Sequence, residues 1–269
     1  MITSAHNPHV KRVRALHTRR GRSKYKQAVL EGVRLLKAAL AAQAAFDFVL
    51  YTPTAAQQEE IAALLRQLEG RGITCWELAE PLLPKVTAME TPPGILAVVN
   101  QQTVGLEDLL LSAEPLLAVA EDLRDPGNLG TLVRTAHAAG AEAVILLGQP
   151  VDVYNPKVLR AAAGATFRVP IVTSVAVDKF CAWAGQQRVR ILAATSRAEV
   201  DCFHLSLRGP VAIVVGNEAY GLSAEMLAAA DERVRIPMVP TAEALNSAVA
   251  AAILLYEAVR QRRQQTKID

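Results

Sequence analysis

The sequence predicts an α/β protein of two domains, the second of them built on a parallel sheet with helices on both faces. Three observations predict this. Short, continuously apolar runs alternate with helical patterns along the second half, as is typical of buried parallel strands. The chain has 269 residues, 51% of them hydrophobic, which is enough for two cores. A change of pattern near residues 100–114 separates two domains, which we place at 1–105 and 106–269.

The first half opens with a basic segment and then alternates between helical and extended patterns. Val33, Leu36 and Leu40 recur at helical spacing, and Gly70 and Gly72 end a second helical pattern. We expect helices at 25–43 and 55–69, and strands at 46–52, at 73–78 and after the turn that opens 91–101. This alternation indicates a small α/β domain.

The second half begins with a connector at 100–115 that contains a short helix. We expect strands at 115–123, 143–147, 167–172, 190–194, 211–215 and 234–236, and helices at 128–139, 156–163, 179–186, 223–230 and 242–263. Ser223 is well placed to cap the fourth of these helices. Parallel sheets usually bind ligands at the carboxyl ends of their strands, so the informative residues are expected in the loops after strands.

Two of these loops carry polar residues next to glycine. The first has Asn128 in a Pro-Gly turn and Arg134 on the helix that follows. In the second, an apolar strand ends at Gly216, where a ligand can approach the backbone, and Asn217 and Glu218 come next. Each loop taken alone is also explained by an ordinary turn, with a solvated Arg134 and a surface Glu218.

A third loop leads into the final helix, which is apolar almost all round. Such a helix is usually buried in a core or in an oligomer interface. Asn246, near its start, is a polar group among small and apolar residues, and it needs a hydrogen-bond partner if it is buried. A role in capping the helix also explains it.

Basic residues are concentrated at the N-terminus. The formal net charge is only +3, but residues 1–26 hold eight Lys or Arg and no Asp or Glu. Such a segment is either a patch that binds nucleic acid or a solvated basic arm, and the sequence supports the two interpretations equally. Aromatic residues make up 4% of the chain, which disfavours RNA binding by base stacking on an aromatic platform.

Other classes of protein are disfavoured by what the sequence lacks. Three isolated cysteines without C-x-x-C spacing argue against a disulfide framework and a structural zinc site. No apolar stretch follows the N-terminal charges and no run of about 18 apolar residues occurs, so we expect a cytoplasmic protein without a membrane span. A G-x-G-x-x-G fingerprint is missing, which argues against a dinucleotide-dependent oxidoreductase.

Three segments of the second half resemble, in order, the motifs of one enzyme family. They are N-L-G-T-L-V-R-T-A, V-V-G-N-E-A-Y-G-L and I-P-M-x5-A-L-N-x2-V-A, within residues 117–260. They resemble the three motifs of the SpoU, or TrmH-like, RNA 2′-O-methyltransferases. In the first half, N-P-H-V-K-R-V-R-A-L and L-E-G-V-R-L-L resemble the L30e-like substrate-binding domain that precedes the catalytic domain in many members.

The resemblance implies a fold, a methyl donor and an assembly. The fold is an α/β sheet whose C-terminal segment forms a deep trefoil knot, an exception to the rule of unknotted chains. The donor is S-adenosylmethionine, held in the knot largely by backbone groups, and members are homodimers without a metal ion. By position, the residues expected at the donor are Thr195, Gly216, Asn217, Ile236, Met238 and Leu245.

The resemblance also implies which residues carry the reaction: Asn128, Arg134, Glu218 and Asn246. We expect Arg134 to bind the phosphate next to the target ribose, because a guanidinium stays protonated and is a poor base. That phosphate could itself take the proton. Glu218 and Asn128 would orient Arg134, and Asn246 would hold the ribose or the base edge. The residues expected to contact RNA phosphates are Lys11, Arg12, Arg19, Arg20, Arg22 and Lys24.

Two positions depart from the family pattern. Pro240 stands where Gly is common, which stiffens the loop, and Ala244 stands where Ser is usual, which removes a hydroxyl. The resemblance still implies an enzyme that methylates a ribose 2′-hydroxyl, and the additional N-terminal domain makes 23S ribosomal RNA the expected substrate. The alternatives are a tRNA 2′-O-methyltransferase and a non-catalytic RNA-binding or ribosome-assembly protein that lost turnover through Ala244.

Overall fold

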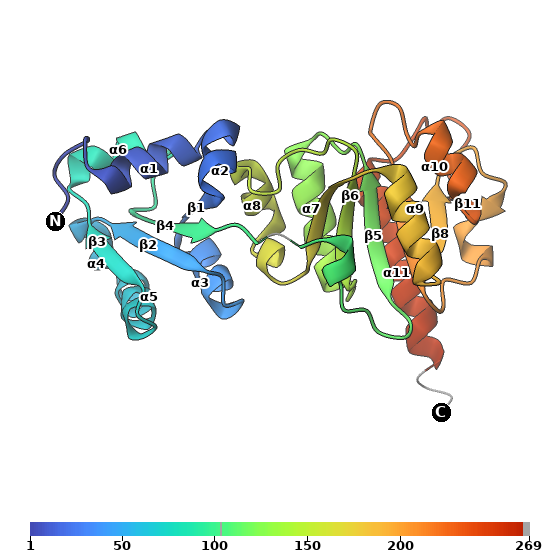
Figure 1. Cartoon of the computed structure of the whole chain (residues 1–269), viewed down its shortest axis with the longest axis horizontal. Helices are drawn as coiled ribbons and strands as arrows, with labels where there is room; N and C mark the ends of the chain where they lie inside the picture. The colour runs from blue at the N-terminus through green and yellow to red at the C-terminus, as the bar shows by residue number, and fades with distance from the viewer. Residues whose placement is uncertain (103, 266–269) are drawn as a thin grey trace. The chain divides into compact units, whose positions relative to one another are not determined.

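The computed structural model describes residues 1–102 and 104–265, and the chain forms two compact units. One consists of Met1–Gln102 and Asp152–Phe167, and the other of Thr103–Val151 and Arg168–Asp269. Each unit has its own sheet and helices (Figure 1). The domain boundary between residues 105 and 106 stays a prediction, and no sequence pattern indicates that residues 152–167 pack with the first unit.

The first unit is an α/β domain around a mixed sheet of four strands, as formed by the described residues. In the order β1-β4-β2-β3, the strands are β1 (Gln27–Glu31), β4 (Ile95–Asn100), β2 (Phe46–Tyr51) and β3 (Thr74–Glu77). Strand β4 is antiparallel to both of its neighbours, and β2 and β3 are parallel. The helices are α1 (Pro8–Leu16), α2 (Arg19–Tyr25), α3 (Val33–Ala41), α4 (Pro53–Ala56), α5 (Glu59–Gly70), α6 (Leu83–Val86) and α8 (Pro156–Ala162).

The prediction of a helix over residues 25–43 is wrong in its first part, because strand β1 precedes helix α3 there. Lys26 adopts a left-handed backbone conformation with φ 53°, and Gly32 has φ 92°, so the chain turns at both ends of β1. Residues 27–30 are buried, and β1 pairs with β4. A strand buried on both faces is as apolar as a buried helix, so periodicity alone does not distinguish them.

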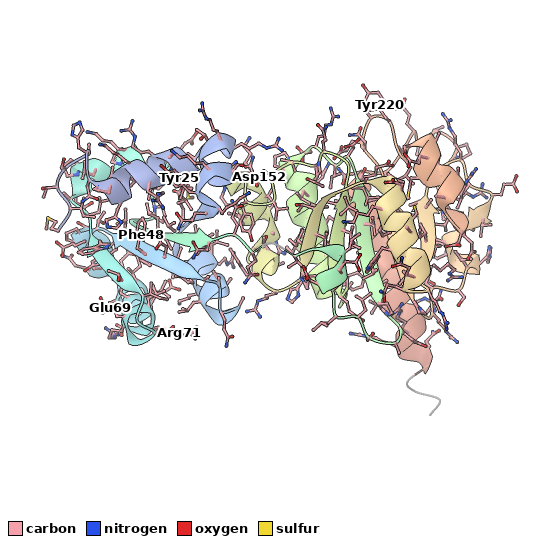
Figure 2. The ribbon with its side chains drawn as sticks, viewed as in Figure 1. Tyr25, Phe48, Glu69, Arg71, Asp152 and Tyr220 are labelled. Carbon is pink, nitrogen blue, oxygen red and sulfur yellow. The ribbon has the colours of Figure 1, made fainter. Side chains whose placement is uncertain are left out.

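Helices α1 and α2 meet at a close contact beside which Arg22 is buried. A Cβ on Gly21 would lie 1.9 Å from the carbonyl oxygen of Ala15, so only glycine permits this approach. The Arg22 guanidinium donates to two carbonyl oxygens at the end of α1 and to Asp152 Oδ2 at 2.7 Å (Asp152 in Figure 2). Its side chain is 4% exposed. The prediction that Arg22 contacts RNA phosphates is therefore wrong, because its charge is paired inside the first unit.

Replacing Arg22 with alanine is expected to destabilise the protein by about 3–5 kcal/mol, because the largely buried Asp152 would lose its partner. The urea midpoint of unfolding, followed by circular dichroism, should fall accordingly. Arg20→Ala is the matched control, since Arg20 is exposed on the same helix and its loss should cost less than about 0.5 kcal/mol. Equal midpoints for the two variants would contradict the structural role of Arg22.

The second unit contains, within the described residues, a seven-stranded sheet in which every neighbouring pair is parallel, as predicted. In spatial order the strands are β7 (Ile171–Val175), β6 (Ala143–Leu147), β5 (Leu116–Glu121), β10 (Val211–Val215), β8 (Arg190–Ala194), β11 (Glu232–Arg235) and β9 (Val200–Asp201). The helices are α7 (Pro126–Ala138), α9 (Val177–Gln186), α10 (Ala224–Ala229) and α11 (Ser247–Gln265).

Helices cover both faces of this parallel sheet (Figure 1). Alternate residues of the central strands, such as Val119 and Val214, pack in one buried cluster with Phe180 and Trp183 of α9 and Met226 of α10. The residues between them face the other side, where α7 and α11 contact β5, β6 and β10. Strands β5 and β10 are buried along their whole length, which explains why they are almost continuously apolar.

Two elements of the second unit begin later than predicted. The strand expected at 167–172 is β7, which starts after Pro170, a residue without an N–H for the ladder. The final helix starts at Ser247 and not at residue 242, because Asn246 accepts backbone N–H groups of its first turn. The trefoil knot stays a prediction. None of the helices in the described residues combines the length and the apolar character that a membrane span requires.

Candidate active site

The loops that follow the central strands β5 and β10 lie side by side because these strands pair. Two hydrogen bonds join the end of β5 to the segment between β10 and α10. The buried Glu121 carboxylate accepts the backbone N–H of Ser223 at 2.8 Å, and Asn217 Nδ2 donates to the carbonyl oxygen of Asp122 at 2.9 Å. The sheet therefore holds together two loops that are far apart in the sequence, as expected for carboxyl ends of parallel strands.

Three of the four predicted catalytic residues form one hydrogen-bonded chain at this edge of the sheet. Asn128 Nδ2 donates to Glu218 Oε1 at 2.7 Å, and Asn246 Nδ2 donates to Asn128 Oδ1 at 2.9 Å. The three residues come from the start of α7, from the loop after β10 and from the position before α11. The structure thus brings these side chains together, and their roles in catalysis stay predictions. We call this set the polar chain.

Helix ends hold the two amides of the polar chain. Asp125 caps α7 by accepting the backbone N–H of Asn128 at 2.7 Å. Asn246 Oδ1 accepts two backbone N–H groups of α11, at 3.0 and 3.2 Å. Because that oxygen faces backbone donors, the amide N–H₂ of Asn246 must point to Asn128, whose own N–H₂ then points to Glu218. Asn246 is therefore both a helix cap and a member of the polar chain.

Arg134 does not join the polar chain. It lies on α7, six residues after Asn128, which places it on a different face of the helix. Its side chain is exposed, and among the described residues it has no hydrogen-bond or ion-pair partner. The structure contradicts the expectation that Asn128 orients Arg134, because Asn128 uses both ends of its amide on Glu218 and Asn246.

A cleft of about 340 Å³ opens beside the polar chain, at the ends of β8, β10 and β11 and the start of α11. All residues predicted to contact the methyl donor line it, namely Thr195, Gly216, Asn217, Ile236, Met238 and Leu245. Glu218 lines it as well, so the cleft and the polar chain share a side chain. Ala244 also lies in its wall, so the hydroxyl that the family commonly carries at this position would face the cleft.

Gly216 lets two segments of the cleft wall approach each other. A Cβ at this position would lie 2.2 Å from the carbonyl carbon of Gly221 and 2.5 Å from the nitrogen of Leu222. Two backbone hydrogen bonds between Asn217 and Gly221, at 3.0 and 2.8 Å, close the loop that carries Glu218. The glycine therefore permits tight backbone packing around the cleft, in addition to the ligand approach expected from the sequence.

Sequence reasoning missed two residues of this region. The hydroxyl of the buried Ser247 donates to the carbonyl oxygen of Gly216 at 2.8 Å and so ties α11 to the loop after β10. Tyr220 lines the cleft and is 88% exposed (Figure 2). The signal for Tyr220 is a large aromatic side chain within a loop of small and polar residues. For Ser247 no pattern in the sequence separates it from the other small residues of α11.

The three cysteines are not arranged as nucleophiles. Burial raises the pKa of the Cys75 thiol to about 11, and burial also raises the pKa values of Cys181 and Cys202. These thiols are therefore protonated near neutral pH and offer little thiolate. In the part of the chain that the structure describes, no three His, Cys, Asp or Glu side chains are grouped so that they could hold a metal ion.

The first unit presents most of its predicted RNA contacts to solvent. Lys11, Arg19, Arg20 and Lys24 are exposed on α1 and α2. Arg12 is partly buried and donates from Nη1 to Gln27 Oε1 at 2.7 Å. Neither helix contains an acidic residue, so the exposed charges of α1 and α2 are all positive and attract phosphates. Contact with RNA stays a prediction for these five residues.

Two family models match the chain, one in each half. The model of the MRM3-like substrate binding domain matches residues 7–97. The model of the SpoU rRNA Methylase family matches residues 115–256, which is more than half of the chain. The chain belongs to the SpoU rRNA methylase family. The second match includes every member of the polar chain.

Relatives of this SpoU methylase match it over nearly its whole length. The chain is 34% identical over 258 residues to the 23S rRNA (guanosine(2553)-2′-O)-methyltransferase RlmP of Bacillus subtilis. The matched segment covers 95% of this chain and 97% of RlmP. The AdoMet-bound rRNA methyltransferase of Sinorhizobium meliloti has 30% identity and a TM-score of 0.86, covering 96% of this chain and 97% of that one. The AdoMet complex of the SpoU methyltransferase AviRb of Streptomyces viridochromogenes has 29% identity and a TM-score of 0.85. That match covers 96% of this chain and 98% of the AviRb chain.

Proposed function

We propose that this SpoU methylase transfers a methyl group from S-adenosylmethionine to a ribose 2′-hydroxyl of 23S ribosomal RNA. The polar chain of Asn128, Glu218 and Asn246 beside the cleft is the observation that carries the proposal. RlmP supports the substrate class, and the two AdoMet-bound neighbours support the donor, since all three match along both units. The exposed basic residues of α1 and α2 support RNA as the partner.

The cleft suits the donor in size and in chemistry. Its volume of about 340 Å³ lies within the range of about 300–1,000 Å³ that is usual for small-molecule sites. Apolar Ile236, Met238 and Leu245 line it together with the polar Thr195 and Asn217, which suits a molecule with a flat aromatic base that packs on apolar side chains and with polar groups that need hydrogen bonds. When bound, S-adenosylmethionine supplies an electrophilic methyl group.

The polar chain prepares the ribose side of the site. Glu218 Oε1 is occupied by the Asn128 amide, whereas Oε2 accepts no hydrogen bond from the described residues and is left for the 2′-hydroxyl. A hydroxyl must lose its proton as it becomes a nucleophile, and a carboxylate positioned to accept that proton helps the reaction. Because Asn128 and Asn246 already hold the carboxylate in place, part of the ordering is complete before RNA binds.

Arg134 acts on the phosphate next to the target ribose in this proposal. The planar fork of donors on an arginine guanidinium fits phosphate oxygens. It has no partner to give up among the residues described, so phosphate binding breaks no ion pair. Phosphate binding by Arg134 thus fixes the position of the ribose without requiring a neutral arginine.

The methylase also acts as a homodimer in this proposal, with α11 at the interface. Val249 and Tyr256 are 45% and 50% exposed on this helix, and the partly exposed Ala252, Ile253 and Val259 continue the same stripe at helical spacing. An apolar stripe of this kind marks an interaction surface more often than a solvated one. A second copy is the partner because the family resemblance implies a homodimer.

Replacing Tyr256 with glutamate is expected to convert the dimer into monomers, because a charge would be buried at the centre of the stripe. Light scattering should show a fall in molar mass to about half. Leu110→Glu is the control, since Leu110 is 97% exposed outside α11 and the dimer should survive its replacement. A monomeric wild-type protein, or a dimeric Tyr256→Glu variant, would contradict this interface.

The reaction is tested by incubating the purified methylase and methyl-labelled donor with total ribosomal RNA and, separately, with total tRNA. We expect label in the ribosomal RNA alone. Label in tRNA alone would establish the tRNA alternative. Donor binding in calorimetry without label in either pool would instead support the non-catalytic RNA-binding alternative, for which Ala244 in the cleft wall is the corresponding feature.

A further inference from the structure

The first unit contains a second cleft, also of about 340 Å³, between α1, β2 and β3. Its lining includes His9 and Arg12 from α1, Phe48 from β2 and Trp76 from β3. We propose that this cleft binds an unpaired nucleobase of the RNA substrate, stacked on Trp76. The proposal rests on the proposed function, because it takes RNA as the ligand. It adds a base-binding site to the first unit, in addition to the exposed positive charges of that unit.

Three aromatic rings meet in this cleft. The His9 ring lies 4.5 Å from the Phe48 ring in an edge-on arrangement and 5.6 Å from the Trp76 ring, tilted by 31° (Phe48 in Figure 2). Phe48 is buried, whereas Trp76 is 41% exposed. A large ring that is packed from behind and still reaches solvent is a surface on which a planar base can stack. The low aromatic content of the chain therefore does not exclude stacking, because these rings gather at one place.

The polar groups of the cleft suit the edge of a base better than a phosphate. The Arg12 guanidinium is fixed by its bond to Gln27 Oε1 and by the Tyr25 ring, whose centroid is 4.0 Å away. Gln27 Nε2 in turn donates to Asp47 Oδ2 at 2.9 Å. The Asp47 carboxylate repels a phosphate, but beside a fixed guanidinium it offers an acceptor next to a donor, which is what a base edge requires.

The charges around the cleft suit the rest of the strand. Lys24 is exposed on α2, and its Nζ lies 5.1 Å from the centroid of the Tyr25 ring, against which Arg12 also packs. An RNA phosphate next to a bound base would meet this positive charge, which adds affinity without choosing a sequence. A base can enter the cleft only when it is unpaired, so the site favours single-stranded segments and loops over duplex.

Tryptophan fluorescence reports on this cleft, because the chain has two tryptophans and the other, Trp183, is 3% exposed in the second unit. We expect a short single-stranded RNA of mixed sequence to quench Trp76, and the same strand annealed to its complement to quench it far less. Trp76→Phe should abolish the quenching and keep the affinity, measured by anisotropy of the labelled RNA. Trp76→Ala should weaken binding about 5- to 150-fold, the range for one stacked base.

Phe203→Ala is the matched control, because Phe203 is 55% exposed in the second unit and its loss should leave the RNA affinity unchanged. RNA binding without quenching, or equal affinities of Trp76→Ala and the wild type, overturns the base site and leaves the proposed reaction intact. Failure to bind either RNA overturns the base site together with RNA as the partner. Methyl transfer to ribosomal RNA is measured in a separate experiment. Failure of the base site is therefore distinguished from failure of the proposed methyltransferase function.

Discussion

Replacing Glu218 with glutamine is expected to slow methyl transfer by at least about 100-fold, the lower range for loss of a positioned general base. Glutamine keeps the length of the side chain and one oxygen for the Asn128 amide. An N–H₂ group replaces the second oxygen, and it cannot accept the proton of the 2′-hydroxyl. Single-turnover rates with labelled donor measure the effect, and calorimetry should show that the donor still binds.

Glu225→Gln is the matched control for this variant. Glu225 is an exposed carboxylate in the first turn of α10, within the same unit and outside the polar chain. Its replacement should leave the rate within about twofold of the wild type, as expected for a surface change of small energetic effect. A Glu218→Gln rate equal to that of Glu225→Gln would remove Glu218 from the reaction.

Replacing Gly216 with alanine is expected to weaken donor binding by at least about fivefold and to lower the melting temperature, because an overpacked site costs about 1–3 kcal/mol. The added Cβ would lie 2.2 Å from the Gly221 carbonyl carbon, a backbone atom that can move only with its loop. Such a shift disturbs the Asn217–Gly221 pairing and therefore the loop that carries Glu218. Calorimetry with the donor and thermal unfolding measure the two effects.

Gly185→Ala is the control for the glycine variant. A Cβ on Gly185, in helix α9, would meet nothing within 4 Å, and alanine is the better helix former. Donor affinity should therefore be unchanged and stability slightly raised. Wild-type donor affinity in Gly216→Ala would show that the loop tolerates the methyl group and that its close packing does not shape the cleft.

The parallel sheet and its loops are predictable because burial leaves a direct trace in the sequence. Strands β5 and β10 are buried along their whole length, so they read as apolar runs, and the polar residues after each run mark the carboxyl edge of the sheet. Strand β1 is also buried and largely apolar, but the apolar residues of the following helix α3 recur at helical spacing. A helix predicted from that spacing therefore extends backwards over β1. Its identity is decided by pairing with β4, which lies far along the chain.

The site is predictable in its residue types and less so in its contacts. The motifs single out Asn128, Glu218 and Asn246, yet the order of hydrogen bonds among them follows from two helix caps that fix the amides. Arg22 shows more clearly that contacts cannot be predicted from residue type, because in the sequence it is one of eight basic residues within residues 1–26. Its burial depends on Gly21 at the helix contact and on Asp152, which is 130 residues away.

The clefts illustrate the same limit. Residues of the donor cleft are adjacent to recognised motifs, so most of them could be predicted by position. His9, Phe48 and Trp76 come from three separate elements of the first unit, and no spacing in the sequence connects them. Only the packing of α1 against β2 and β3 brings their rings together.

The proposed function depends above all on which atom of the RNA receives the methyl group. Alkali cleaves RNA through the 2′-hydroxyl, so a methylated 2′-oxygen protects the phosphodiester bond that follows it. Ribosomal RNA labelled by the methylase should therefore be hydrolysed with alkali and its products separated by size. We expect the label in alkali-resistant dinucleotides, and we expect it to vanish when Arg134→Ala replaces the wild type. Label recovered in mononucleotides would show that a base is methylated and would contradict the proposed reaction.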